Sequence, residues 1–471
     1  MFPATRIAAR LTVGATTLVL ATFLGTHSPG VAIAVSTFTV DSAADQGDYT
    51  PGDGVCATGP NGPCTLRAAI EEANASAGRD TIAFDLHRSR RIAPTSPLPP
   101  LTDPAVIDGT TQPGFLSKPL IELDGSLAGN ATGLLLSAGD SVVRGLIING
   151  FAGVGIGVVS DNNVIQGNFV GMDASGRYDR GNKLDGLVVS GEGNLIGGTE
   201  PRAGNVISGN DKAGILLAPG GTRVQGNLIG TDFKGDKRIG NSFSGIQACG
   251  CYPGGFPPGL PLIGGSEPGA GNVISGNAVD GINGEGVIVA IGNKIGTNVD
   301  GNKPLGNGRA GIAVYGSLWG AYVEARGNII AFNGAEGINA DSGLSLGNSI
   351  YSNGGPGLDL DNALGPPALE SASRTDGEVI ISGSAQADPG ATVKIEAFSN
   401  DSCDASGSGE GQRLVAAVTL TTDSSGSVDF SINTNAPLHR AKYITAALTT
   451  GLGGGSYTSD FSNCLPVSIT H

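Results

Sequence analysis

A pattern that recurs three times constrains the fold of this chain more than any other feature of its sequence. The copies lie about sixty residues apart and keep their glycines and Gly-Asn pairs while other positions vary: GNFVGMDASGRYDRGN (167–182), GNLIGTDFKGDKRIGN (226–241) and GNKIGTNVDGNKPLGN (292–307). Self-similarity at a fixed period is the signature of a solenoid, in which each repeat packs only on its neighbours. We therefore expect a stacked, repeated architecture.

A shorter period runs inside the longer one. Pairs of asparagines recur about 20 to 22 residues apart, at Asn205 and Asn227, at Asn272 and Asn293, and at Asn328 and Asn348. The intervening segments, such as NVIS and GILLA, alternate apolar with polar or small residues, as a strand with one buried face does. Leucine-rich repeats share this period but need regularly spaced leucines and helical segments. The pattern predicts an all-β chain folded as a parallel β-helix, which should be right-handed because parallel crossovers almost always are.

Asparagine and glycine suit the corners of such coils. Asparagine tolerates the left-handed backbone conformation, and its amide can bond the coil above. The segment GTDFKGDKRIGN (230–241) and its copies read as insertions that leave a coil at one corner and return. We expect them at the same corner of every third coil or so, stacked on one side, where solenoids place binding surfaces. The longer segment 249–271 is expected to leave from another corner.

Both ends of the solenoid need caps. Residues 64–78 form the one convincing helix, with Thr65 as N-cap and Gly78 at its end. Beyond about residue 365, a linker (GPPALESASRTDG) precedes alternating strands separated by turns, which predict a C-terminal β-sandwich. The predicted organisation is a signal peptide (1–34), an N-terminal cap (35–90), the β-helix (91–365) and the sandwich (366–471).

The N-terminus has the charged start, apolar run and small-x-small site of a secretory signal, and the run is too short to span a bilayer. Export permits disulfides, and proximity pairs Cys56 with Cys64 and Cys403 with Cys464. The state of Cys249 and Cys251, in CGC, stays open between a strained bridge, a free pair and a weak metal site. We expect a secreted or cell-surface protein with no integral membrane segment after signal cleavage.

The chain resembles a known family at its N-terminal end. The stretch TFTVDSAADQGDYTPGDGVCATGPNGPCTLRAAIEEANA (37–75) is similar to the CSLREA-type domain of exported bacterial proteins, although CTLRAAI (64–70) departs from the motif that names it. IDGTTQPGF (107–115) and the NVISGN repeats are similar to the segments that come after that domain in such proteins. The resemblance implies a right-handed β-helix of the pectate-lyase-like superfamily and no particular reaction. PGATVKIEAFSNDSCDASGSGEGQ (389–412) and YTSDFSNC (457–464) resemble C-terminal immunoglobulin-like modules.

The charge of the chain limits the classes of partner that it can bind. The net charge is −15 and the lysines and arginines are not clustered, which excludes nucleic acid as a partner. A polyanionic glycan would be repelled unless a divalent cation bridged it. Asp173, Asp232 and Asp300 lie in the repeated insertions and are candidate calcium ligands, because Ca²⁺ prefers carboxylate oxygens. The alternative is that these loops only need Asp-Gly turns.

Carboxylates on stacked coils could also reach the spacing that glycoside hydrolysis requires. The candidates are Asp173, Asp185, Asp232, Glu285, Asp300, Glu336, Asp341, Asp359 and Asp361. A polysaccharide lyase would instead combine calcium with an Arg or Lys base. Trp319, Tyr315 and Tyr322 could stack a sugar ring.

From these observations we expect a binding scaffold for extracellular polysaccharides or a cell-surface component. The alternative is a lyase or hydrolase acting on the loop-decorated face.

Overall fold

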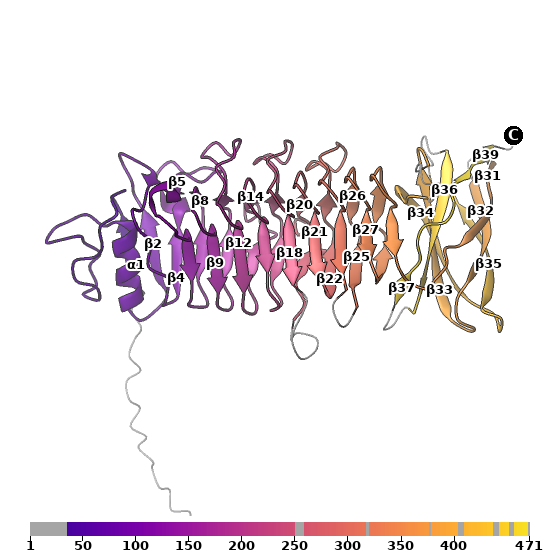
Figure 1. The fold of residues 1–471 in the computed structure, drawn as a ribbon, viewed down its shortest axis with the longest axis horizontal. Helices are drawn as coiled ribbons and strands as arrows, with labels where there is room; N and C mark the ends of the chain where they lie inside the picture. Colours follow the sequence, from indigo (N-terminus) through magenta and orange to yellow (C-terminus); the bar gives the residue numbers. More distant parts are fainter. Residues whose placement is uncertain are drawn as a thin grey trace, which may run out of the picture. The chain divides into compact units, whose positions relative to one another are not determined.

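The structure is a computed structural model that describes residues 35–249, 259–316, 320–375, 378–403, 409–436, 442–451 and 456–469. Residues 35–360 contain three long sheets whose strands are all parallel, with one strand per coil in each sheet. This is the predicted parallel β-helix (Figure 1). The hand of the coil stays a prediction.

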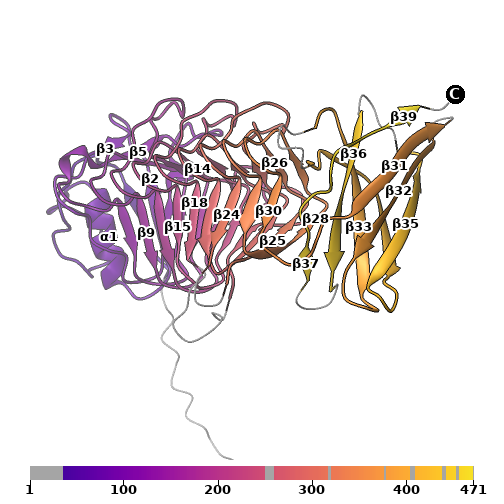
Figure 2. The same ribbon diagram turned by 45° about the vertical axis from the view of Figure 1, so that its right-hand side comes forward.

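Sheet A has 11 described strands, in the spatial order β1 (Thr37–Val40), β2 (Asp80–Phe84), β4 (Ala105–Asp108), β7 (Val142–Arg144), β10 (Val164–Gln166), β13 (Leu195–Gly197), β16 (Arg223–Gln225), β19 (Leu262–Gly264), β22 (Val287–Ile291), β25 (Tyr322–Arg326) and β28 (Ser342–Leu346). Sheet B has 10, namely β3 (Arg91–Ile92), β5 (Ile121–Asp124), β8 (Leu146–Asn149), β11 (Phe169–Val170), β14 (Val206–Ile207), β17 (Leu228–Ile229), β20 (Val273–Ile274), β23 (Lys294–Ile295), β26 (Ile329–Ala331) and β29 (Ser349–Tyr351). Sheet C has 9, namely β6 (Leu134–Leu136), β9 (Ile156–Val159), β12 (Leu187–Ser190), β15 (Ile215–Leu217), β18 (Ile246–Cys249), β21 (Ile282–Glu285), β24 (Ile312–Tyr315), β27 (Ile338–Ala340) and β30 (Leu358–Leu360). Figure 2 shows strands of sheet C side by side.

The interior of the coils is a set of aliphatic stacks. In sheet B the strand register aligns one inward residue per coil, and each of these residues is at most 1% exposed: Ile92, Leu123, Ile148, Val170, Ile207, Ile229, Ile274, Ile295, Ile330 and Ile350. Burying one such side chain contributes about 1.5–3 kcal/mol. The alternation seen in the sequence is thus the alternation between this interior row and the outer face of the sheet.

Two asparagine ladders hold the corners. The ladder between sheets A and B runs through Asn168, Asn205, Asn227, Asn272, Asn293, Asn328 and Asn348. The ladder between sheets B and C runs through Asn182, Asn210, Asn241, Asn277, Asn307, Asn333 and Asn353. In both, the side-chain amide and the backbone N–H of one asparagine donate to the Oδ1 of the next, so the predicted bonding between coils is confirmed. The expectation that these asparagines adopt the left-handed conformation is wrong, because none of them has a positive φ.

The residue that precedes the corner often has to be glycine. Gly230 has φ of 86°, and a Cβ there would lie 2.3 Å from the carbonyl oxygen of Ser275 on the next coil. No side chain fits that gap, which explains why the Gly survives in each copy of the repeat.

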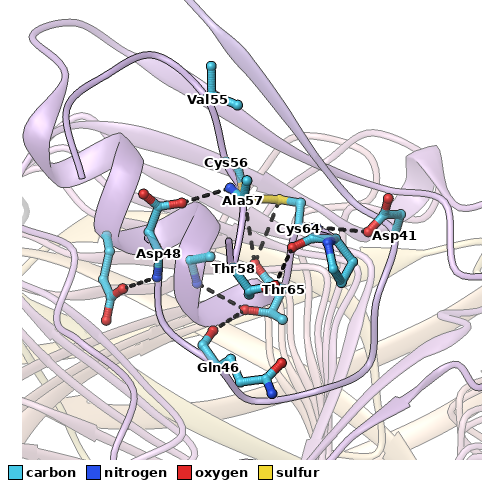
Figure 3. Close-up of a disulfide and its surroundings, with 12 residues drawn as sticks. Asp41, Gln46, Asp48, Val55, Cys56, Ala57, Thr58, Cys64 and Thr65 are labelled. Atoms are coloured by element: carbon cyan, nitrogen blue, oxygen red, sulfur yellow. Dashed lines mark hydrogen bonds between the residues drawn. A yellow bond between two sulfur atoms is a disulfide. The ribbon is translucent and has the colours of Figure 1, made fainter. Parts of the chain in front are cut away.

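A short helix lies at the N-terminal end of the coils. The helix α1 (Leu66–Ala75) packs against β1 and β2, and the hydroxyl oxygen of its N-cap, Thr65, accepts from the N–H of Ala68. It is the only α-helix among the described residues; two 3₁₀ turns, η1 (Gly109–Thr111) and η2 (Gly125–Leu127), follow it. The helix ends at Ala75 with Ser76 as its C-cap, so the prediction that it extends to Gly78 is wrong. The predicted Cys56–Cys64 disulfide is present beside the helix start, with the Cys64 N–H donating to Asp41 (Figure 3).

The C-terminal residues form two antiparallel layers, as predicted. One layer contains β35 (Ser427–Thr434), β32 (Glu378–Gln386), β31 (Ala368–Thr375) and β39 (Ser468–Ile469), the last parallel to β31; the other contains β34 (Arg413–Thr421), β33 (Thr392–Asn400), β36 (Tyr443–Thr450) and β37 (Tyr457–Thr458), with β38 (Leu465–Pro466) also on β36. The Cys403–Cys464 disulfide is present. The expected linker is wrong in part, because residues 368–375 are β31, which pairs with β32 and buries Leu369 and Ala372 in the sandwich core.

The sandwich closes the last coil. Phe398, Ala447 and Phe461 of the sandwich belong to the same apolar cluster as the coil interior. Backbone bonds join Ile350 of β29 to Gly411 in both directions, and the Asp460 carboxylate accepts from the N–H of Leu360 in β30. The Glu410 carboxylate accepts from the N–H of Asn353, the last member of the second ladder. The module therefore caps the exposed end that a solenoid would otherwise present.

Candidate functional site

The three repeated insertions stack on one another. We call residues 172–181, 231–240 and 297–306 the insertion loops; each is closed by an isolated bridge, Met172 with Asp179, Thr231 with Arg238 and Thr297 with Pro304. The N–H of Phe233 in the second loop donates to Gly176 in the first, and that of Val299 in the third donates to Gly235 in the second. The predicted stacking is confirmed, and Figure 1 shows the loops on one side of the coils, near β14, β20 and β26.

The loops occur on alternate coils, not on every third. Strands β11, β17 and β23 each lead into an insertion loop, and β14 and β20, which lie between them in sheet B, do not. The sequence period led us to expect a loop on every third coil, because a coil that carries a loop is longer than a coil without one. The distance between two loops thus covers two coils of unequal length.

The acidic residues of the loops shape turns. Oδ1 of Asp173 accepts from the Ser175 hydroxyl at 2.9 Å and from the N–H groups of Arg177 and Tyr178 at 3.0 Å. Oδ1 of Asp232 accepts in the same way from Asp236 and Lys237. Burial opposes ionisation of Asp173, but these hydrogen bonds outweigh it and lower its pKa.

The equivalent position in the third loop is Asn298, whose Oδ1 accepts from Asn302 and Lys303. Asp300 lies two residues further on, where its carboxylate accepts from the Asn298 amide at 3.4 Å. The three candidate calcium ligands are therefore not equivalent, and an amide can replace the carboxylate. Among the residues that the structure describes, no group of three or more His, Cys, Asp or Glu side chains could hold a metal ion. Calcium binding stays a prediction.

A second family of loops faces the first across sheet B. We call residues 198–204 (GTEPRAG) and 265–271 (GSEPGAG) the proline loops; they connect β13 to β14 and β19 to β20 on the coils without insertion loops. Two adjoining depressions of about 410 and 390 Å³ are lined by proline loops, by the outer face of sheet B and by the insertion-loop residues Phe233 and Val299. We call these two depressions together the sheet B groove.

The floor of the groove is apolar except for Lys294. The outward row of sheet B contains Phe169, Val206, Leu228, Val273 and Lys294 in register. Phe169 and Val206 pack with Ile147 and Met172 in a small cluster of their own, outside the coil interior. An apolar floor with a few polar groups on its walls is the usual construction of a ligand site.

Positive charge gathers around one aromatic ring in the groove. Phe233 lies 6.4 Å from Phe169, centroid to centroid, and the Lys118 Nζ lies 4.6 Å from the centroid of Phe233. Arg177 and Lys234 each lie 5.9 Å from the same centroid. Within the described ranges, none of these three cations has a carboxylate at ion-pair distance. The surroundings of the Phe233 ring are thus locally cationic although the chain as a whole is acidic, and of these three cations Lys118 lines the groove.

The carboxylates that line the groove are Glu200 and Glu267, which were not among the candidates chosen from the sequence. They occupy the same place in the two proline loops, in GTEP and GSEP. The recurrence of this short motif was the sequence signal that could have identified the two glutamates. It is easily overlooked beside the longer insertions, which contain more aspartates.

The remaining candidate carboxylates lie elsewhere. Asp185 is nearly buried at the corner before β12, where burial raises its pKa against the opposing N–H of Ala213. Asp341 accepts from the N–H of Ala321, and Asp359 from the Asn339 amide. Glu285 and Glu336 belong to β21 and to the turn before β27. None of these residues lines the groove.

Asp359 and Asp361 are brought together with Asp460 of the sandwich. Burial, followed by the charges of Asp359 and Asp361, raises the pKa of Asp460 despite the N–H donated by Leu360. This acidic group lies at the junction with the last coil, and its Asp460–Leu360 bond is part of the cap.

Neither Tyr315 nor Tyr322 lines the groove. Tyr315 ends β24 in sheet C, and its hydroxyl oxygen accepts from Arg309. Tyr322 begins β25 in sheet A, donates to the carbonyl of Ser456 and has a pKa raised by burial. Trp319, Cys251 and the side chain of Cys249 lie outside the described residues.

Comparisons with known proteins give no family. No family model matches the sequence, and no curated protein matches it either. Among solved structures, the chain is similar to the enzymatically active domain of tailspike protein 4 of bacteriophage CBA120, with 10% sequence identity over 87% of this chain and 67% of the phage chain, and a TM-score of 0.21. With so low a score, the likeness adds nothing to the fold and groove derived above.

Proposed function

We propose that this protein is a secreted or cell-surface scaffold that binds an extracellular glycan in the sheet B groove. The observation that carries the proposal is the groove itself, a largely apolar floor framed by two stacks of loops, with Phe233 on its wall. Three cations surround that ring, and none of them has an ion-pair partner among the described residues. An aromatic ring offers a face to the C–H groups of a sugar, and Lys and Arg donate to hydroxyl or acidic substituents. The groove extends over several coils, which suits a polymer better than a compact metabolite.

Two further observations support the extracellular placement. The disulfides Cys56–Cys64 and Cys403–Cys464 form and persist in oxidising compartments. Over the ranges described, no helix is long and apolar enough to cross a membrane. The same proposal includes export by the N-terminal signal. It also includes membership of the CSLREA-type and pectate-lyase-like groups and an immunoglobulin-like relationship of the sandwich.

Binding to a glycan array tests the proposal, using residues 35–471 and matched variants. Phe233→Ala removes the aromatic face of the groove, and Phe243→Ala removes an exposed ring that lies outside it. We expect the first change to weaken binding about tenfold or more and the second to leave it unchanged. Equal binding by both variants, or no binding by the unaltered protein, would refute the proposal.

The alternative, a polysaccharide lyase or hydrolase on the same face, needs a different experiment. Glu200 and Glu267 are the carboxylates available in the groove. Incubation with uronic-acid and neutral polymers, with and without Ca²⁺, would release unsaturated or reducing ends if either reaction occurs. Loss of that release in Glu200→Gln or Glu267→Gln would assign the reaction to the groove.

A further inference from the structure

Two residues of the coil corners, Phe332 and Ser352, take a positive φ where other coils have glycine, and Phe332 is the bulky one. The position before each asparagine of the second ladder has a positive φ at several coils, and glycine occupies it at Gly209 (77°) and Gly276 (78°). Phe332 occupies it before Asn333, with φ of 62°. A bulky residue in this left-handed region costs about 1–2 kcal/mol, so glycine would serve the corner better. Strain of this kind persists where the side chain has a purpose.

Packing within the protein opposes that cost. The Phe332 ring meets the ring of Tyr351 on the next coil edge to face, with centroids 5.4 Å apart and planes at 81°. The Tyr351 hydroxyl is fixed by donating to the carbonyl of Gly301 at 3.2 Å. An aromatic pair of this kind contributes about 0.5–1.5 kcal/mol beyond the apolar area that it buries. Both rings are only half-buried, so they are not part of the sealed coil interior.

The two rings line a cavity that we call the distal pocket. It measures about 390 Å³ and is lined from three parts of the chain: the tip of the third insertion loop at Asn302, the last two coils at Phe332 and Tyr351, and the sandwich at Asp401 and Arg413. This volume is within the range of small-ligand sites. It is separate from the sheet B groove, with which it shares no lining residue.

Two of the three charged groups that line the distal pocket, Asp401 and Arg413, neutralise each other, and the third, Glu410, leaves one formal negative charge. Arg413 pairs with Asp401 through two bonds, Nη1 to Oδ1 and Nη2 to Oδ2, each 3.0 Å long. The hydrogen bond from Arg413 to Asp401 is the largest cause of the raised pKa of Arg413. The wall thus offers a planar pair rich in donors and acceptors, with the Asn302 amide beside it, and almost no net attraction for a polyanion.

We propose that the distal pocket is a second carbohydrate site, which takes an uncharged sugar ring. The apolar face of the ring packs on Phe332, and its hydroxyl groups exchange hydrogen bonds with Asn302 and the Asp401–Arg413 pair. The assignment rests on the proposed glycan function for the class of ligand only; the place, the aromatic platform and the preference for an uncharged ring come from the pocket. Its position against the sandwich makes the C-terminal module part of the recognition surface as well as a cap.

The variant Phe332→Gly tests the assignment, because it removes the aromatic ring and places the favoured residue, glycine, at the strained corner. We expect residues 35–471 to bind at least one of four uncharged hexaoses, made of glucose in cellulose or amylose linkage, of N-acetylglucosamine or of xylose, in calorimetric titrations. Phe332→Gly should weaken that binding tenfold or more without lowering the melting temperature, and Asn302→Ala should weaken it as well. Asp140→Gly relieves a positive φ of 56° away from the pocket and should leave binding unchanged.

Each other result overturns the assignment. A lower melting temperature with intact binding would make Phe332 a packing residue. Binding that is lost in Phe233→Ala and kept in Phe332→Gly would leave the groove as a glycan site and remove the pocket. If none of the four hexaoses binds the unaltered protein while acidic polymers do, the glycan function stands and the distal pocket does not.

Discussion

The asparagine ladders predict a large cost for a small change at Asn227. This side chain is fully buried; its Oδ1 accepts from the backbone N–H and the side-chain amide of Asn205, each at 2.9 Å. Its own amide donates to Asn272 and to the carbonyl of Ile196, also at 2.9 Å. In Asn227→Ala the Asn205 N–H keeps no acceptor in a corner closed by the neighbouring coils.

A buried donor without a partner costs about 1–3 kcal/mol, and the two lost amide bonds add about 0.5–1.5 kcal/mol each. We therefore expect Asn227→Ala to lower the free energy of unfolding by about 2–6 kcal/mol. Urea unfolding followed by circular dichroism measures the change, and hydrogen exchange should show the Asn205 amide exchanging roughly 100-fold faster. Asn130→Ala, on an exposed asparagine, is the control and should stay within about 0.5 kcal/mol of the unaltered protein. Equal effects of the two changes would refute the structural role given to the ladder.

Three further predictions concern the cap, the loops and pH. Phe461, 4% exposed and 5.5 Å from Phe398, fills the end of the coil interior, so Phe461→Ala should lower the free energy of unfolding by about 3–5 kcal/mol; a change below about 1 kcal/mol in urea unfolding would mean that the sandwich is not the cap. Asp173→Ala should lower the melting temperature and Asp173→Asn should largely preserve it, because an amide oxygen can accept the same N–H groups; a calcium role predicts instead that EDTA lowers the melting temperature of the unaltered protein and has no effect on Asp173→Asn. Asp460 has a raised pKa, so its contribution to stability is complete below the ordinary carboxyl value of about 4 and is lost as the pH rises through the raised value. The Asp460→Asn variant should therefore have a higher melting temperature than the unaltered protein at pH 7 and the same melting temperature near pH 3. A lower melting temperature of the variant at pH 7 would contradict the assignment.

The residues that form the coil corners could be predicted from the sequence. Asn168, Asn227 and Asn293 align in the three copies of the repeat, and they belong to one ladder because a corner imposes the same backbone and the same amide geometry on every coil. The helix start at Thr65 and the Cys56–Cys64 disulfide were likewise predictable, since capping and the closure of a loop with a sequence separation of 8 are local. The Cys403–Cys464 disulfide, with a sequence separation of 61, was also predicted although it is not local.

The features that the sequence did not reveal depend on neighbours that are distant along the chain. Glu200 and Glu267 reach the groove because bare and loop-bearing coils alternate, and the unequal coil lengths hid that order. Phe332 looks like an ordinary apolar residue until its φ is known. The use of Glu410 and Phe461 to close the coils depends on how the sandwich docks, which no repeat encodes.

The register of neighbouring coils supports every site proposed above, and cysteine cross-linking measures it directly. Val164 and Leu195 are register partners on the outer face of sheet A, and Arg223 is the partner of Leu195 one coil further on. In a protein with Cys249 and Cys251 replaced by serine, the pair Val164→Cys and Leu195→Cys should form a disulfide on mild oxidation, because parallel neighbours lie about 4.8 Å apart. The pair Val164→Cys and Arg223→Cys, about twice as far apart, should stay reduced. Efficient bridging of the second pair, or none of the first, would contradict the stacking from which the groove and the distal pocket are built.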